Sequence, residues 1–290
     1  MYESYFQELR FSRQNLNELP NLSIYTNLKT LKCNSNRIMQ LDNLPNTLKI
    51  IDCSTNEIEH LDNLPYDLEK LVCSLNRLIY LDNLPSNLCF LDCSYNRLTH
   101  LDNLPSNLCF LDCSHNHLIQ LDNLPGGLTD LNCSGNRIMQ LDNLPSGLTD
   151  LICSDNKLTQ LDNLPSNLIN LNCNINNISS LDNLPLTLTK LSCSINRLTQ
   201  LNNLPLNLIT LICNCNKLLT LDNLPIHLTK LECYYNKLSL LDKLPNNLKE
   251  LNCSNNNITH LDNLPKTLSV LSCKENKITC LDNLPCKPNV

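Results

Sequence analysis

Residues 48–67 read LKIIDCSTNEIEHLDNLPYD, and the same phrase returns every 20 residues along the chain. Its pattern is L-x-x-I-x-C-x-x-N-x-I-x-x-L-D-N-L-P-x-x. Thirteen units share the core Leu-x-x-Leu/Ile-x-Cys-x-x-Asn-x-Leu/Ile and begin at Leu28, Leu48 and so on to Leu268. The cysteine and the asparagine are present in all thirteen. A fixed period of this length is typical of a solenoid in which one coil stacks on the next.

Each unit predicts one short strand. A strand over residues 50–54 places Ile51 and Cys53 on one face and residues 50, 52 and 54 on the other. A single coil cannot bury its leucines alone, so coils must stack and bury them against the same residues of their neighbours. Pro45 blocks a helix, and the ten residues between cores are too few for a long one. We therefore expect a parallel sheet on one side and polyproline-II segments with short 3₁₀ turns on the other, with little α-helix.

The asparagine of each unit predicts a ladder. Asn56 follows the strand where the chain turns inward. Its carboxamide has two donors and an acceptor, enough to satisfy backbone groups of its own coil and of adjacent coils. An aspartate at this position would bring a buried charge and lose the donors.

The repeat also predicts the domain organisation. We interpret residues 1–27 as an N-terminal cap with a degenerate repeat, and residues 28–290 as thirteen repeats of a single solenoid domain. Helical spacing suggests that the N-terminus could cover the first coil with Tyr2, Tyr5, Phe6 and Leu9. The C-terminus, LDNLPCKPNV (281–290), has no recognisable cap. An open last coil would expose its strand edge and leucines. Fraying, a bound partner or end-to-end association would each resolve this exposure, and the sequence does not choose among them.

Composition excludes several classes of protein. Four glycines in 290 residues argue against glycine-rich phosphate loops and dinucleotide fingerprints. The N-terminal MYESYFQELRFSRQ has no apolar run, so we expect neither a secretory signal nor a membrane span. Eighteen cysteines without a signal then favour free thiols in a reducing compartment, the cytoplasm. A net charge of −6 argues against nucleic-acid binding.

The repeat resembles the leucine-rich repeat. The phrase LDNLPxxLxxLxCxxNxL is similar to the 20-residue bacterial-type repeat of enterobacterial effectors. With its Asp-Asn pair and interior Cys, it most resembles the leucine-rich repeat proteins of amoeba-infecting giant DNA viruses. The resemblance implies a right-handed superhelix with a concave parallel sheet, a protein partner and, if viral, a role in the infected host cytoplasm. Some of the enterobacterial effectors carry a Cys-based ubiquitin-ligase domain after the repeats. In this chain the repeats run to residue 285. The residues Cys153-Ser-Asp155 match the letters of a ligase active site, but they lie within an ordinary repeat.

The positions expected beside the concave sheet are the most varied. Two units, 81–100 and 101–120, differ mainly at residues 95, 97, 115 and 117 of their cores. Over all thirteen units, the positions equivalent to 50, 52, 54, 55 and 57 hold fourteen Lys/Arg and ten Asp/Glu, a net charge of +4. The rest of the chain then carries −10 of the total of −6. A mixed face suits a protein better than a phosphate backbone, although solvated strand decoration would look the same.

Aromatic residues are rare and cluster at these positions. Binding hot spots favour aromatic and Arg anchors ringed by polar groups. The candidate partner-binding residues are therefore Phe90, Asp92, Tyr95, Arg97, Phe110, Asp112, His115, His117 and Arg137, with a second aromatic pair at Tyr234 and Tyr235.

Structural packing competes with several chemical roles for the remaining candidate residues. The ladder cysteines are expected to be inert in an apolar core, and the off-ladder thiols to be more accessible: Cys89, Cys109, Cys215, Cys280 and Cys286. His115 and His117 could bind a surface metal instead of having no role beyond the repeat. The aspartate column that begins at Asp42 could bind calcium, or each aspartate could instead cap a turn through its own backbone. We expect no catalytic residue, resident metal or cofactor.

The sequence thus predicts a non-enzymatic protein-interaction module that binds an unidentified host or viral protein on its concave face, with no nucleic-acid or membrane partner. The alternative is a structural protein that self-associates through the solenoid end or its acidic convex side.

Overall fold

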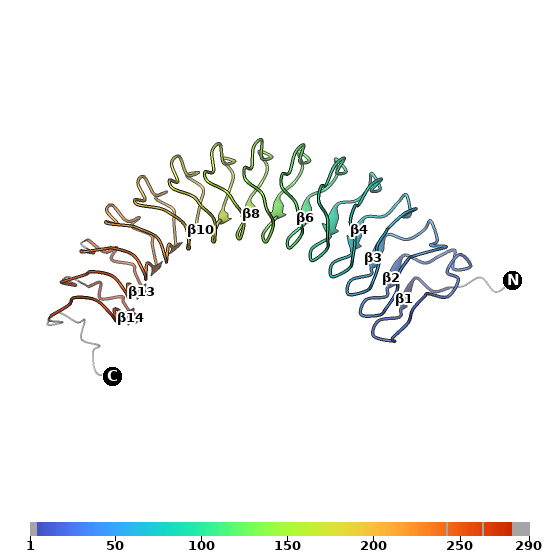
Figure 1. Ribbon diagram of the computed structural model, residues 1–290, viewed down its shortest axis with the longest axis horizontal. Helices are drawn as coiled ribbons and strands as arrows, with labels where there is room; N and C mark the ends of the chain where they lie inside the picture. Colours follow the sequence, from blue (N-terminus) through green and yellow to red (C-terminus); the bar gives the residue numbers. More distant parts are fainter. Residues whose placement is uncertain (1–4, 242, 263, 280–290) are drawn as a thin grey trace. The chain divides into compact units, whose positions relative to one another are not determined.

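The computed structural model describes residues 5–241, 243–262 and 264–279. The chain forms two compact units, residues 1–148 and 149–290. Within each unit, successive 20-residue coils lie side by side (Figure 1). The expectation of a single solenoid domain over residues 28–290 stays a prediction.

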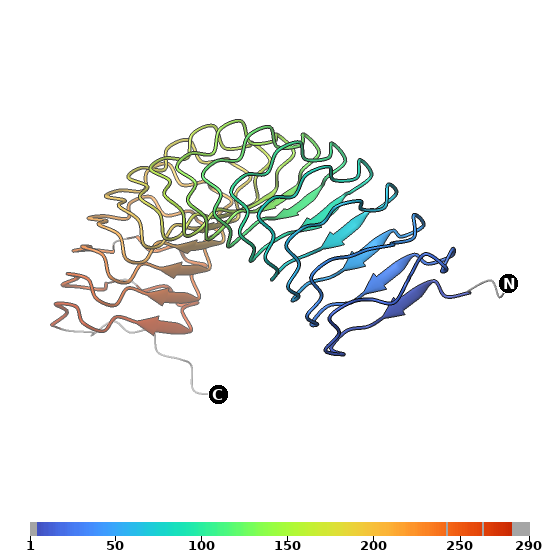
Figure 2. The same ribbon diagram turned by 45° about the vertical axis from the view of Figure 1, so that its right-hand side comes forward.

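Every described coil contributes one three-residue strand. The first unit holds β1 (Glu8–Arg10), β2 (Thr30–Lys32), β3 (Ile50–Asp52), β4 (Lys70–Val72), β5 (Phe90–Asp92), β6 (Phe110–Asp112) and β7 (Asp130–Asn132). The second holds β8 (Asp150–Ile152), β9 (Asn170–Asn172), β10 (Lys190–Ser192), β11 (Thr210–Ile212), β12 (Lys230–Glu232), β13 (Glu250–Asn252) and β14 (Val270–Ser272). Within each unit, neighbouring strands pair in parallel and in chain order (Figure 2).

The predicted alternation along the strand is confirmed. In β3, Ile51 is fully buried and its neighbours Ile50 and Asp52 are half-buried. Cys53 follows and is also fully buried. Strands pair with a shift of 20 residues, so each Leu or Ile packs on the same residue of the next coil, as Ile51 does on Leu71. The core is therefore a stack of identical aliphatic and cysteine columns.

The predicted asparagine ladder is present. Asn56 is 8% exposed. Its Nδ2 donates to the carbonyl of Cys53 in its own coil at 3.0 Å and to that of Cys33 in the preceding coil at 3.0 Å. Its Oδ1 accepts the backbone N–H of Ile38 at 3.0 Å. These three backbone groups would otherwise be buried without a partner. The carboxamide therefore links neighbouring coils through hydrogen bonds.

The return path of each coil is extended, with one short turn. The backbone N–H of Leu48 donates to the carbonyl of Pro45 at 3.2 Å, which is a single i→i+3 bond of the 3₁₀ type. The same bond recurs at Leu68 and Pro65. The described residues form no helix, and thus none long and apolar enough to cross a membrane.

Two columns of residues adopt the left-handed conformation. One follows the Asp of each LDN phrase and is nearly all asparagine, as at Asn43 with φ of 53°. The other precedes the ladder asparagine and varies widely, from Thr55 with φ of 56° to Ile195 with φ of 54°. Asparagine tolerates this conformation and β-branched residues resist it, so the two columns differ in strain.

The N-terminus differs from expectation. No helix forms over the described residues there, because Glu8–Arg10 instead pairs with β2 at a shift of 22 residues, with Leu9 opposite Leu31. Tyr5 is 86% exposed and Phe6 60% exposed, although the Phe6 ring meets that of Tyr25 at 6.2 Å. Tyr2 and the C-terminal residues 281–290 lie outside the described residues.

Candidate functional site

The strand positions decide which candidate residues face solvent. Residues at positions 90 and 92 of β5 are half-buried, and Tyr95 is 50% exposed. Position 94, just before Tyr95, was also expected to be exposed. This expectation is wrong for Ser94 and for its equivalent Ser114, which are 7% and 3% exposed. The hydroxyl of Ser94 turns back to the Oδ1 of Asp92 at 2.7 Å, which draws it into the sheet surface.

Two predicted phenylalanines form a stack. Phe90 and Phe110 are direct register partners on β5 and β6. Their rings are parallel, with an interplanar angle of 1° and centroids 4.2 Å apart. The Nζ of Lys70 on β4 lies 3.9 Å from the Phe90 ring centroid, so a cation covers the outer face of the stack. Lys70, Phe90 and Phe110, which occupy the same position in three consecutive coils, thus form one continuous row.

Two predicted aspartates lie beside this row. Asp92 and Asp112 are register partners, and each Oδ1 accepts the N–H and hydroxyl of the serine two residues later. Asn132 donates from Nδ2 to the Oδ2 of Asp112 at 2.9 Å. Among the described residues, neither carboxylate has an ion-pair partner, and the Oδ2 of Asp92 accepts no hydrogen bond. Two neighbouring negative charges are therefore left without a counter-charge.

A second stack runs along the other side of the aspartates. Tyr95 and His115 stack with ring centroids 4.2 Å apart and an interplanar angle of 16°. Gly135 follows in the same column with φ of 65°, and a Cβ built on it would lie 2.5 Å from the Nδ1 of His115. The absence of a side chain there leaves room for the imidazole. We call the six residues Phe90, Asp92, Tyr95, Phe110, Asp112 and His115 the aromatic–acidic patch.

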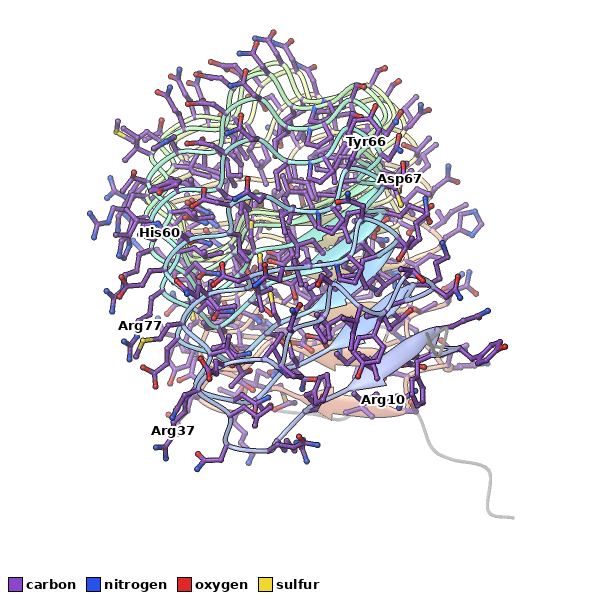
Figure 3. All side chains as sticks on the ribbon, turned by 90° about the vertical axis from the view of Figure 1, so that its right-hand side faces the viewer. Arg10, Arg37, His60, Tyr66, Asp67 and Arg77 are labelled. Atoms are coloured by element: carbon purple, nitrogen blue, oxygen red, sulfur yellow. The ribbon has the colours of Figure 1, made fainter. Side chains whose placement is uncertain are left out.

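The remaining candidates in the first unit belong to a different surface. Arg97, His117 and Arg137 are exposed. Their column also holds Arg37 and Arg77, which lie with His60 on one flank, away from Tyr66 and Asp67 on the other (Figure 3). Arg77 pairs with Glu57 at 3.0 Å. This column is therefore a basic edge next to the sheet surface.

Tyr234 and Tyr235 lie in the second unit. Their rings meet edge to face with centroids 5.8 Å apart, and Tyr235 is 57% exposed. Nearby, Lys230 binds Glu232 at 2.8 Å and Glu250 at 3.2 Å. These ion pairs raise the pKa of Lys230 above its ordinary value, chiefly through the hydrogen bond to Glu232. The charges here are already paired, unlike those of Asp92 and Asp112.

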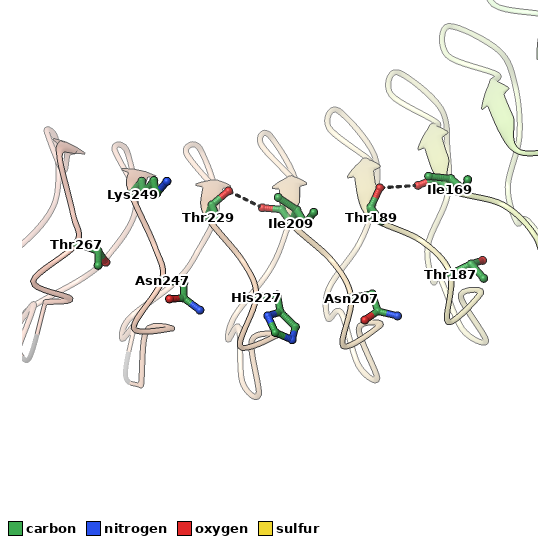
Figure 4. Close-up of a pocket in the computed structure, with 10 residues that line it drawn as sticks. All are labelled: Ile169, Thr187, Thr189, Asn207, Ile209, His227, Thr229, Asn247, Lys249 and Thr267. Carbon is green, nitrogen blue, oxygen red and sulfur yellow. Dashed lines mark hydrogen bonds between the residues drawn. The ribbon is translucent and has the colours of Figure 1, made fainter.

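The second unit also carries a groove that sequence reasoning missed. It has a volume of about 770 Å³ and crosses successive coils on the side where each strand begins (Figure 4). Ile169 and Ile209 line it, and Thr189 and Thr229 donate to their carbonyls at 3.3 Å each. These two hydroxyls are bonded within the solenoid, and His227 and Lys249 also line the groove.

The aspartates of the LDN phrase do not cap turns as expected. Among the described members of that column, which are all exposed, no carboxylate accepts a backbone N–H. Asp42 accepts only from Gln40 Nε2, at 2.7 Å. The left-handed Asn43 turns the chain by itself, so no side-chain cap is needed. The Asx turns lie instead at Asp52 and its equivalents, where Ser54 N donates to Asp52 Oδ1 at 3.1 Å.

Similar solved structures share this architecture. YopM from Yersinia enterocolitica WA-314 superposes with a TM-score of 0.86 and 34% identity over 97% of this chain and 67% of that one. A YopM described as a leucine-rich effector protein from Yersinia pestis gives 0.84 and 30% identity over 96% and 86% of the two chains. The chain is a leucine-rich repeat protein. No protein-family model matches this sequence, and no curated protein does either.

This leucine-rich repeat protein shares one further feature with a solved structure. The functional domain of InlJ from Listeria monocytogenes, described as including a cysteine ladder, gives a TM-score of 0.83 and 32% identity over 95% of this chain and 64% of that one. In this chain the ladder thiols from Cys33 to Cys253 are buried and form no disulfide, and Cys273 is half-buried. Burial raises the pKa of Cys133 and of Cys173 to about 12. Such thiols are poor nucleophiles, and Cys153, considered for a ligase site, is also fully buried.

Proposed function

We propose that this leucine-rich repeat protein is a non-enzymatic interaction module whose partner protein binds the aromatic–acidic patch on the concave, sheet-bearing face. The observation that carries the proposal is the pair Asp92 and Asp112, held between two aromatic stacks with no counter-charge among the described residues. Like charges in neighbouring coils repel, at a cost of about 0.8 kcal/mol for a separation of ~5 Å in water. The Oδ1 atoms of both aspartates serve the Asx turns to Ser94 and Ser114, which leaves the Oδ2 of Asp92 for a partner.

The patch favours a partner segment that presents a basic side chain. An Arg or Lys head would neutralise Asp92 and Asp112, while its aliphatic stem would pack along the edges of the Phe90 and Tyr95 stacks. Aromatic side chains ringed by polar groups are the common anchors of protein interfaces. A nucleic acid would instead meet two carboxylates where its phosphates need cations.

The other candidates would surround this contact. Arg97, His117 and Arg137 form the basic edge next to the patch, and we propose that they meet acidic groups at the rim of the partner. Rim charges affect the association rate more than the affinity. Tyr234 and Tyr235, in the second unit, would serve as a separate contact.

The proposed compartment and the absence of catalysis rest on the thiols. The sixteen cysteines in the described part of the chain form no disulfide, as expected of a protein kept in a reducing environment, and most of them are buried with raised pKa values. We propose a cytoplasmic location, which would be the infected host cell if the likeness to giant-virus repeats extends to the origin of the chain. Self-association through the solenoid end or the acidic convex side is the competing function.

The test uses affinity capture from host cytosol with two matched variants. The patch variant changes Phe90, Tyr95, Phe110 and His115 to Ser. The control variant changes Met39, Ile119 and Met139 to Ser, since these side chains are 55–64% exposed and lie outside the patch. Both must melt close to wild type.

We expect a host protein that wild type and control retain and the patch variant loses, followed by direct binding of that protein after purification. Equal retention by all three chains would contradict the patch. A concentration-dependent dimer that survives in the patch variant, with no partner captured, would favour self-association.

A further inference from the structure

Two thiols outside the cysteine ladder lie side by side. Cys89 and Cys109 each come one residue before a register partner of the Phe90–Phe110 pair. The backbone N–H of Cys109 donates to the carbonyl of Cys89 at 2.9 Å, so the two residues are direct neighbours across coils. Both side chains are exposed, whereas Cys215 and Cys273 are half-buried and the ladder thiols are buried. Among the described residues, they are the only exposed pair of thiols.

Their sulfur atoms are held at similar places. The Sγ of Cys89 donates to the carbonyl of Glu69 at 3.3 Å, and the Sγ of Cys109 donates to the carbonyl of Cys89 at 3.1 Å. Each thiol therefore points across to the preceding coil. Equivalent residues of adjacent strands lie ~4.8 Å apart, with side chains that project in the same direction. The neighbouring Cys109 thiol adds to desolvation in raising the pKa of Cys89, which is consistent with sulfur atoms in contact.

This geometry disfavours a disulfide. Parallel Cβ vectors do not reach the perpendicular dihedral of an S–S bond without movement of the backbone. An ion that binds both sulfurs at once has no such requirement, because it accepts one electron pair from each thiolate.

The available donors restrict which ion fits. No group of three or more His, Cys, Asp and Glu side chains is gathered in the described part of the chain. Structural zinc needs four protein ligands and catalytic zinc three, so a zinc site is not available here. Soft thiolate ligands select soft ions such as Cu(I), and a d¹⁰ monovalent ion is satisfied by two sulfurs in a linear arrangement.

We propose that Cys89 and Cys109 form a two-thiolate site for a soft monovalent metal ion of the Cu(I) class. Both thiols lose their protons to solvent when the ion binds, so one ion replaces two protons and the protein gains one negative charge. Binding therefore strengthens as pH rises. The site is independent of the proposed partner surface, although it lies one residue away from the Phe90–Phe110 stack.

The test is a titration of the reduced, full-length protein with Cu(I) under anaerobic conditions, against a chromophoric Cu(I) chelator as competitor. Native mass spectrometry gives the stoichiometry. The variants are Cys89→Ser, Cys109→Ser and the double variant, and Cys215→Ser is the matched control because its half-buried thiol stands alone. Thermal melting confirms that all are folded.

We expect wild type and Cys215→Ser to bind one ion with equal affinity. Each single variant should bind at least about 100-fold more weakly, because a second tethered ligand raises affinity by 10²–10⁴. Wild-type affinity should rise between pH 6 and 8. Unchanged affinity in the double variant, a single variant as tight as wild type, or failure of wild type to compete with the chelator would each overturn the proposal.

Discussion

The Oδ1 of Asn116 accepts the backbone N–H of Leu98, a residue of the preceding coil, at 2.9 Å. Its Nδ2 donates to the carbonyls of Cys93 and Cys113 at 3.1 Å each. The side chain is 4% exposed, so water cannot replace these bonds. One carboxamide therefore satisfies three backbone groups from two coils.

Replacement of Asn116 by Ala should be strongly destabilising. Each buried polar group left unpaired costs about 1–3 kcal/mol, so we expect a loss of at least about 2 kcal/mol in the free energy of unfolding. Urea denaturation measures it. Asn107→Ala is the control, because the Nδ2 of Asn107 makes an exposed bond to the carbonyl of Ser86 and should contribute under about 0.5 kcal/mol. Equal effects of the two variants would contradict the ladder.

The buried thiols predict a loss of stability at alkaline pH. Burial raises the pKa of Cys133 and of Cys173 to about 12, against an ordinary value of 9.0. Above pH 9 the unfolded thiol ionises while the folded one stays protonated, so stability falls as pH rises from 9 to 12. Each thiol should lose about 1.4 kcal/mol by pH 10.

The measurement is the free energy of unfolding at pH 8 and pH 10, in wild type and in Cys133→Ala/Cys173→Ala. The double variant should lose roughly 3 kcal/mol less than wild type over this interval, whatever its stability at pH 8. The same pH dependence in both chains would rule out this contribution.

The two left-handed columns predict opposite effects of exchanging their residues. Ile195 and Asn203 have nearly the same φ, 54° and 53°. An ordinary side chain in this conformation costs about 1–2 kcal/mol, and asparagine less. Ile195→Asn should therefore raise stability by about 1 kcal/mol, and Asn203→Ile should lower it by a similar amount. Chemical denaturation of both variants decides; a fall in both would mean that side-chain contacts outweigh the backbone.

Gly135 predicts an energetic coupling across coils. A Cβ at this position would lie 2.5 Å from the Nδ1 of His115, and φ is 65°. Gly135→Ala should cost about 1–2 kcal/mol from the backbone alone, with an added cost from the displaced imidazole. In a His115→Ala background this second cost should vanish. A double-mutant cycle with no coupling would contradict the contact.

The repetitive features of this fold could be predicted from the sequence. The position of Cys53 and Ile51 on one face follows from a period of two, and the role of Asn56 follows from its donors and its invariance among thirteen units. Both depend on rules that every coil obeys, so each unit supports the same inference.

Features set by backbone conformation could not be predicted in this way. We expected the turn cap at Asp42, but the Asx turn lies at Asp52, because Asn43 is left-handed and turns the chain unaided. Likewise, Ser94 was expected to be exposed, but its hydrogen bond to Asp92 keeps the side chain buried. Residue type alone does not reveal φ, and the letters Asp and Ser suit several places in a turn.

The candidate site was predicted in composition rather than in geometry. Phe90 and Phe110 were singled out as rare aromatics, but their parallel stacking and the cation of Lys70 above them required the register. The adjacency of Cys89 and Cys109 was implicit in the period, since identical positions in consecutive units are always neighbours. Their exposure and hydrogen bonds were not.

The direction of the asparagine bonds has a consequence for synthesis on the ribosome. The carboxamide of Asn56 completes the coil that contains Ile38, which has already left the ribosome, as well as its own. At about 5–20 residues per second, a new coil emerges in roughly 1–4 s. Each newly made asparagine then closes the coil before it, so the solenoid can fold vectorially, with only its most recent turn waiting for a successor.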